Sequence, residues 1–175
     1  GLYAQDANPI TGLMAEEGIR ALGAGIGRVV SHLDDLDARA DCLYGAWLCG
    51  AVLGSVGMAL HHKLCHTLGG TFNLPHAETH TIVLPHALAY NREAAPLAMQ
   101  RIARALGASE AALGVFDLAR DNGAPTALKD IGLKESDIGI ALDIALKNPY
   151  WNPRPLERTA LRALLEAAYE GRRPN

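Results

Sequence analysis

Apolar residues recur at intervals of three and four along most of this chain, the spacing of helices with one buried face. The first such segment opens at Pro9 and Thr11 and carries apolar side chains at Ile10, Leu13, Met14, Ile19, Leu22, Ile26 and Val29. Alternating strand-like runs are absent, and the one β-branched patch, residues 81–84, is short. The pattern predicts an all-α helical bundle of seven or eight helices.

Glycine and proline divide the rest of the pattern into further helices. We expect them at residues 36–68 (one long helix or two joined), from Pro75 onward, and at 95–106, 110–122, 134–147 and 156–169. Gly69 and Gly70 should end the long segment and begin a loop that lasts to Pro75, and Pro85 should end or kink the next helix. Ser136 and Asp137 could cap a shorter helix than 134–147, and Gly171 should close the last one.

Residues 43–60 form an uncharged run of the length at which a membrane-spanning helix becomes a candidate. Four glycines interrupt the run, namely Gly45, Gly50, Gly54 and Gly57, and a cluster of histidines begins at the next residue. A buried central helix fits these features better, because glycines let a neighbouring helix approach closely. We therefore expect residues 43–60 near the centre of the bundle, and no membrane partner.

Composition narrows the functional classes. The chain has 175 residues and a net charge of −3, which favours one globular domain and offers no basic surface for nucleic acid. Cys42, Cys49 and Cys65 are odd in number, lie in apolar surroundings and lack the paired spacing of a zinc site. No secretory or transit pattern opens the sequence. These features predict a cytoplasmic protein with reduced thiols.

Six of the seven histidines lie between His61 and His86. Imidazole titrates near neutral pH and binds metal ions, so this segment is the candidate for chemistry. His62 and His66 are four residues apart and share one helix face, and the following loop could return His76 to that face. We predict that the three form one catalytic or metal-binding cleft. The alternative is that they pack or cap helices, as we expect of His80 and His86.

Five positions in this segment and just after it together resemble the signature of the iron-containing alcohol dehydrogenase superfamily. They are His62, His66, Pro75-His76, Leu84-Pro85-His86 and Asn91. Other details are similar to the maleylacetate reductase branch of that superfamily, namely residues 63–65, 69–72, 76–80, 3–9 and 152–154. The resemblance covers essentially the whole chain.

The resemblance implies a larger enzyme. Its relatives join an N-terminal α/β half, which binds NADH or NADPH, to a C-terminal all-α half with a dehydroquinate synthase-like fold. Residues 1–175 resemble that second half, and we expect them to form a single all-α domain. Metal-dependent relatives hold iron or zinc with residues equivalent to His62 and His76 and with an Asp and a His that would precede Gly1. The maleylacetate reductase branch typically replaces the Asp, and Lys63 stands where metal-using relatives have glycine, so a metal-free site is favoured.

The implied activity is the reduction of the dicarboxylate maleylacetate to 3-oxoadipate in the degradation of aromatic compounds, by a homodimer. His62, His66 and His76 would then be catalytic, and Lys63 and Arg154 would bind substrate carboxylates. Two alternatives stay open. One is a metal-dependent alcohol or polyol dehydrogenase of the same superfamily, with His62 and His76 as ligands. The other is a non-catalytic helical module.

Overall fold

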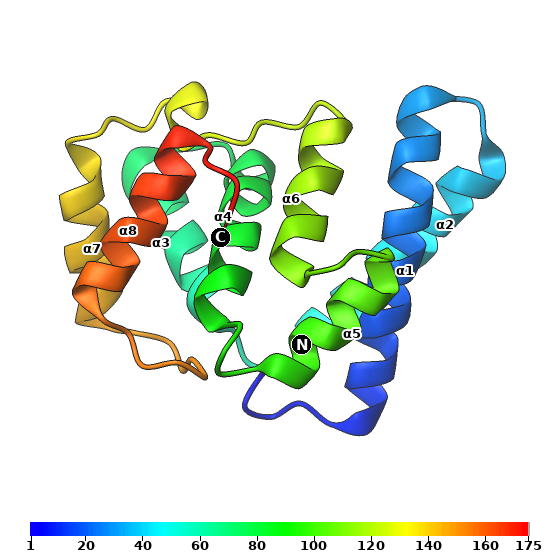
Figure 1. Cartoon of the computed structure of the whole chain (residues 1–175), viewed down its shortest axis with the longest axis horizontal. Coiled ribbons are helices and arrows are strands. Elements are labelled where there is room, and N and C mark those ends of the chain that lie inside the picture. The colour runs from blue at the N-terminus through cyan, green and yellow to red at the C-terminus, as the bar shows by residue number, and fades with distance from the viewer. Residues whose placement is uncertain (175) are drawn as a thin grey trace.

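The computed structural model describes residues 1–174 and, within that range, contains helices and no strand (Figure 1). The helices are α1 (Pro9–Ser31), α2 (Leu36–Leu53), α3 (Leu60–Phe72), α4 (His76–Asn91), α5 (Pro96–Leu106), α6 (Ala111–Asp121), the 3₁₀ helix η1 (Leu128–Ile131), α7 (Asp137–Lys147) and α8 (Arg158–Glu170). The prediction of an all-α bundle is confirmed. The sequence placed most helix starts within a few residues, and the structure shows side-chain caps, Asn8 and Asp35, at the first two.

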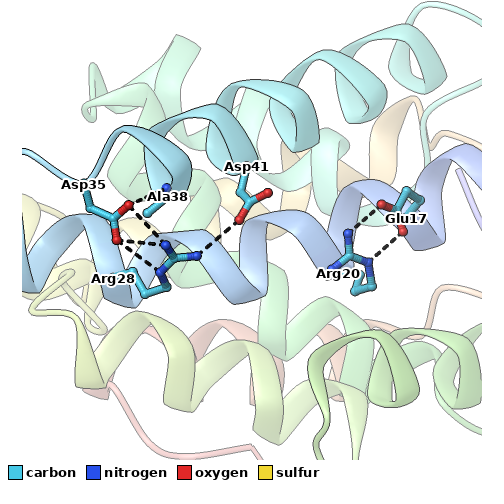
Figure 2. A network of polar contacts seen from close by, with 6 residues as sticks. All are labelled: Glu17, Arg20, Arg28, Asp35, Ala38 and Asp41. Atoms are coloured by element: carbon cyan, nitrogen blue, oxygen red, sulfur yellow. Dashed lines mark hydrogen bonds and ion pairs between the residues drawn. The ribbon is translucent and has the colours of Figure 1, made fainter.

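Helices α1 and α2 form an antiparallel hairpin at one side of the molecule (Figure 1). Glycines let the two backbones touch: a Cβ atom added at Gly45 would lie 2.8 Å from the carbonyl oxygen of Gly18. One turn of the hairpin is fixed by polar contacts, as Figure 2 shows. Arg28 of α1 contacts Asp35 at 2.9 Å and Asp41 at 3.5 Å, and the Asp35 carboxylate also accepts from the backbone N–H of Ala38.

The prediction that residues 43–60 form the central helix is wrong. The run is broken at 54–59, which separates α2 from α3, and α2 lies at the edge of the bundle. Leu43 is 73% exposed and Trp47 is 65% exposed. The physical reason is that Gly45 faces α1, so the apolar residues on the opposite side of α2 point outward. No helix in residues 1–174 is both long and apolar enough to cross a membrane.

Helix α4 occupies the central position instead. Its Ile82, Val83 and Tyr90 belong to a core shared with α3, η1, α7 and α8, whereas its Leu88 packs with residues of α5 and α6. A helix that is buried on most of its circumference must be apolar nearly all round, as residues 82–90 are. The helix that carries part of the histidine segment is therefore held firmly on several sides.

Two helix boundaries differ from those predicted, and a third follows the shorter of two predicted alternatives. Helix α3 continues through Gly69 and Gly70 to Phe72, and its C-cap Asn73 has a φ of 54°, the left-handed conformation of a helix C-cap. Nothing lies within 4 Å of a Cβ added at Gly70, so the glycine there is a tolerated helix residue rather than a stop. Helix α4 runs through Pro85 to Asn91. Helix α7 begins at Asp137, in agreement with the shorter alternative.

The segment between α7 and α8 is clamped to the end of α4 by side-chain amides. Asn91 is fully buried and exchanges two hydrogen bonds with Asn152, at 3.0 and 2.7 Å. The Tyr90 hydroxyl donates to the Pro155 carbonyl at 2.8 Å. Two segments that carried the family resemblance, Asn91 and residues 152–154, are thus bound to each other. The clamp fixes the loop that also bears Tyr150.

Candidate active site

Five histidines form one continuous cluster where α3 meets the start of α4. Helix α3 supplies His61, His62 and His66, and α4 supplies His76 and His80. The His62 ring centre lies 5.0 Å from that of His61, 5.9 Å from that of His66 and 5.1 Å from that of His80. The rings of His76 and His80 are 4.1 Å apart. The His80 ring also lies 4.9 Å from that of His61, so His62 and His80 each neighbour three other rings and together form the hub of the cluster.

The structure brings the three predicted histidines together, with His80 as the bridge. His62 and His66 are neighbours on α3, as their spacing indicated, and His76 reaches His62 through the ring of His80. The two ring separations on that route keep His76 within a helix diameter, about 10 Å, of His62. His61 and His80 were not predicted as site residues. His80 could have been found, because it follows His76 by four residues, the same spacing as His62 and His66.

The exposed end of the cluster includes a tyrosine that the sequence did not reveal. Tyr150, from the loop between α7 and α8, places its hydroxyl 3.2 Å from Nδ1 of the exposed His66. The ammonium of the half-buried Lys63 lies 5.4 Å from the centre of the Tyr150 ring. Lys63, His66 and Tyr150 therefore form a polar rim with hydrogen-bond donors and a cation. No motif marks Tyr150, which lies 84 residues from His66.

Arg154 lies apart from the histidine cluster, against Tyr90. Its guanidinium stacks on the Tyr90 ring, 4.2 Å from the centre, and donates to the Tyr90 carbonyl at 3.1 Å. Tyr90 is ten residues beyond His80 on α4, roughly 15 Å along the helix axis. Of the two residues predicted to bind substrate carboxylates, Lys63 lies beside the histidines, and Arg154 makes its contacts at the opposite end of α4.

Burial keeps the inner histidines neutral. It lowers the pKa of His61 to about 3, against the opposing effect of a hydrogen bond to the His80 carbonyl. Burial, with the charges of neighbouring histidines, lowers the pKa of His80 to about 4. The pKa of His62 is lowered too, first by burial and then by His66. Neutral imidazoles can each donate one hydrogen bond and accept another at physiological pH.

A cavity of about 800 Å³ adjoins the buried side of the cluster. His61 and His62 line it, together with mostly apolar residues from α1, α2, α4, α5 and α6. The cluster thus separates an apolar cavity from the polar rim of Lys63, His66 and Tyr150. His62 faces both regions, and this position suits a residue that contacts a substrate.

The family resemblance implied that His62 and His76 hold a metal ion together with two ligands from outside residues 1–175. Among residues 1–174, one group of three or more ligating side chains has all its donor atoms within 4.8 Å of one another, and it consists of His61, His62 and His80. His76 is outside this group, and its ring neighbours that of His80, which in turn neighbours that of His62.

Comparison with known proteins shows to which family this chain belongs. The C-terminal profile of the Fe-containing alcohol dehydrogenase family matches residues 1–169. The chain belongs to the iron-containing alcohol dehydrogenase family. Its helical bundle is the fold of the C-terminal domain of that family. A 1,3-propanediol oxidoreductase, for example, is 28% identical with a TM-score of 0.88 over 95% of this chain and 47% of its own.

Within the iron-containing alcohol dehydrogenase family, more similar relatives are maleylacetate reductases. The chain is 64% identical to the maleylacetate reductase of Burkholderia cepacia over 99% of its own length and 49% of that protein. The crystal structure of maleylacetate reductase from Agrobacterium tumefaciens is 52% identical, with a TM-score of 0.95 over 99% of this chain and 49% of the other. The chain thus spans about half the length of these relatives.

One pH effect follows from His86, which is buried on α4 away from the cluster and has an unpaired Nε2. Burial, and then the charge of Arg172, lowers its pKa to about 4. The unfolded chain binds this proton near pH 6.5 and the folded chain only near pH 4, so His86 destabilises the fold as pH falls between these values. We expect this effect of His86 to lower the free energy of unfolding by about 2 kcal/mol at pH 5 relative to pH 7.5.

The measurement is the free energy of unfolding against pH for the wild type and His86→Leu. The variant should show a shallower fall between pH 6.5 and 4, whatever its absolute stability. The exposed His32 serves as control, and His32→Leu should keep the wild-type slope. Parallel curves for wild type and His86→Leu would mean that His86 does not titrate differently in the two states.

Proposed function

We propose that this chain is the C-terminal catalytic domain of a maleylacetate reductase. The complete enzyme reduces maleylacetate to 3-oxoadipate with NADH or NADPH in the degradation of aromatic compounds. The observation that carries the proposal is the histidine cluster with its cationic rim, in a chain 64% identical to the corresponding half of a maleylacetate reductase. A cationic, hydrogen-bonding site suits a substrate with two carboxylates and a ketone.

The chemistry to be catalysed is the reduction of an alkene conjugated to a ketone. A nicotinamide held by the N-terminal half supplies the hydride. As the hydride adds to the alkene carbon farther from the ketone, negative charge develops on the ketone oxygen, and the carbon beside the ketone must then take a proton. The hydride, which carries two electrons, and this one proton together saturate the double bond. The protein must stabilise the oxyanion and deliver that proton.

We assign these two tasks to the histidines. His62, half-buried at the hub and facing the cavity, is placed to donate a hydrogen bond to the developing oxyanion, which gains strength where water is excluded. His66 and His76 are exposed and can exchange protons with solvent. We assign proton delivery to one of them. The His80 ring contacts both His76 and His62, so we propose that it fixes the position of His76 relative to His62.

Lys63 is the proposed partner of a substrate carboxylate. Its ammonium lies at the rim beside Tyr150, next to the helix face that carries His62 and His66. The Tyr150 hydroxyl is a second donor at the same place. A carboxylate held by both would lie beside the histidines with the rest of the substrate directed toward His62. Arg154 would contribute only if its contact with Tyr90 opened.

We propose that catalysis needs no metal ion, because the positive charge of Lys63, next to His62 in the sequence, would repel a divalent cation bound there. The test is the rate of maleylacetate reduction by the full-length enzyme after exhaustive dialysis against a strong chelator. Metal content is measured on the same sample. We expect the rate to survive. A rate lost with the metal and restored by iron or zinc would instead support a metal-dependent dehydrogenase.

We also propose that the enzyme is a cytoplasmic homodimer. The exposed apolar side chains of α2, including Leu36, Leu43 and Trp47, support burial against another chain or domain. Three free cysteines are compatible with a reducing compartment. Sedimentation equilibrium of the full-length enzyme tests the assembly, and the mass of a single chain would exclude the dimer.

A further inference from the structure

We propose that His61, His62 and His80 form a binding site for a late first-row divalent ion such as Zn²⁺ or Co²⁺. This donor set differs from the His62 and His76 pair that the family resemblance implies. It consists of two adjacent residues of α3 and one residue of α4. The proposal rests on the distances between the three rings and on their hydrogen bonds.

The three imidazoles already surround one point. Their ring centres are separated by 4.9 to 5.1 Å, and the rings meet edge to face. One donor nitrogen from each lies within 4.8 Å of the other two. Two nitrogens bound to the same zinc ion at about 2.1 Å each lie roughly 3–4 Å apart. Small rotations of the side chains therefore suffice to bring all three onto an ion.

The protonation of the rings favours binding. His61 Nε2 lies 3.1 Å from the His80 carbonyl oxygen, which can only accept, so Nε2 carries the proton and Nδ1 keeps its lone pair. A metal-bound histidine typically makes this kind of bond through its other nitrogen. His80 Nε2 is buried without a hydrogen-bond partner. An unsatisfied buried nitrogen costs free energy, and a bound ion would relieve that cost.

Three imidazoles leave one position of a tetrahedral ion open, as in catalytic zinc sites. The ion would nevertheless use the lone pair of His62, the residue proposed to contact the substrate oxyanion. We therefore expect the ion to inhibit the reductase, a consequence that rests on the proposed function. The cavity beside His61 and His62 provides a route of entry.

The test titrates Co²⁺ into the chelator-treated full-length protein and follows the visible absorption of four-coordinate cobalt, with Zn²⁺ as competitor. Glutamine variants keep the size and a hydrogen-bond donor while removing the imidazole ligand. His61→Gln and His80→Gln should each weaken Co²⁺ binding at least about tenfold. His76→Gln and His66→Gln, which alter histidines outside the set, should bind like the wild type. Circular dichroism confirms that each variant is folded.

Weakened binding in His76→Gln with unchanged binding in His80→Gln would overturn the proposal and favour the pair implied by the family. Unchanged binding in both His61→Gln and His80→Gln would overturn it as well, as would the absence of four-coordinate Co²⁺ in the wild type. These readouts do not depend on turnover. A protein that binds Co²⁺ as expected but does not reduce maleylacetate would contradict the proposed function alone.

Discussion

His62→Ala is expected to lower kcat/KM for maleylacetate by about 10²–10³-fold in the chelator-treated, full-length enzyme, the usual cost of removing one hydrogen-bond donor to an oxyanion. His62 touches the rings of His61, His66 and His80 and lines the cavity. Its removal would deprive the developing oxyanion of the hydrogen-bond donor that we propose for it. It also separates the exposed His66 from the rest of the cluster. Steady-state kinetics with purified variants provide the measurement.

The control is His32→Ala, because His32 is exposed at the C-terminal cap of α1 and makes no contact with the cluster. It should retain the wild-type rate. His62→Gln separates two roles: an amide can donate a hydrogen bond to an oxyanion but cannot titrate. Partial rescue by glutamine would indicate hydrogen bonding, and none would indicate proton transfer. A wild-type rate in His62→Ala would remove His62 from the mechanism.

Gly45→Leu is expected to destabilise the fold by about 3 kcal/mol, the upper end of the cost of overpacking. Even a single Cβ at Gly45 would lie 2.8 Å from the Gly18 carbonyl oxygen and 3.0 Å from the Leu22 backbone nitrogen. These are backbone atoms, which cannot rotate away as a side chain can. Helices α1 and α2 would have to move apart at this point of their contact. The measurement is the free energy of unfolding in urea.

Gly50→Leu is the matched control, on the same helix. Gly50 is exposed, and nothing lies within 4 Å of a Cβ built there. Because leucine favours helix over glycine by up to about 1 kcal/mol, this variant should be slightly more stable than the wild type. The same substitution thus has opposite effects five residues apart. Equal effects at both positions would refute close packing of α1 on α2.

The sequence predicted the helices well and their arrangement less well. Helix starts and ends depend on local residues such as Asn8, Asp137 and Gly171, so they can be read from a single sequence. The position of α2 cannot. Its residues are apolar on most sides, which usually indicates burial. Which side is covered depends on the partner of Gly45, and that partner is set by the tertiary fold.

In the site, too, contacts set by local spacing could be predicted from the sequence, and contacts between distant residues could not. The spacing of His62 and His66 placed both on one helix face, and the return of the chain through His76 was expected from the short loop. His80 was overlooked although its spacing from His76 carried the same information. Tyr150 was beyond reach, because its contact with His66 depends on how the loop between α7 and α8 folds back.

The clamp between Asn91 and Asn152 has a consequence for the order of folding. Its partners are 61 residues apart, and His66 and Tyr150 are 84 residues apart, whereas the α1–α2 hairpin joins neighbouring segments. Contacts that close long loops form slowly, since the entropy of closure must be lost before they stabilise anything. We expect the polar rim to be completed late in folding, after the hairpin. Pulse-labelled hydrogen exchange would show late protection of α8 relative to α1 and α2.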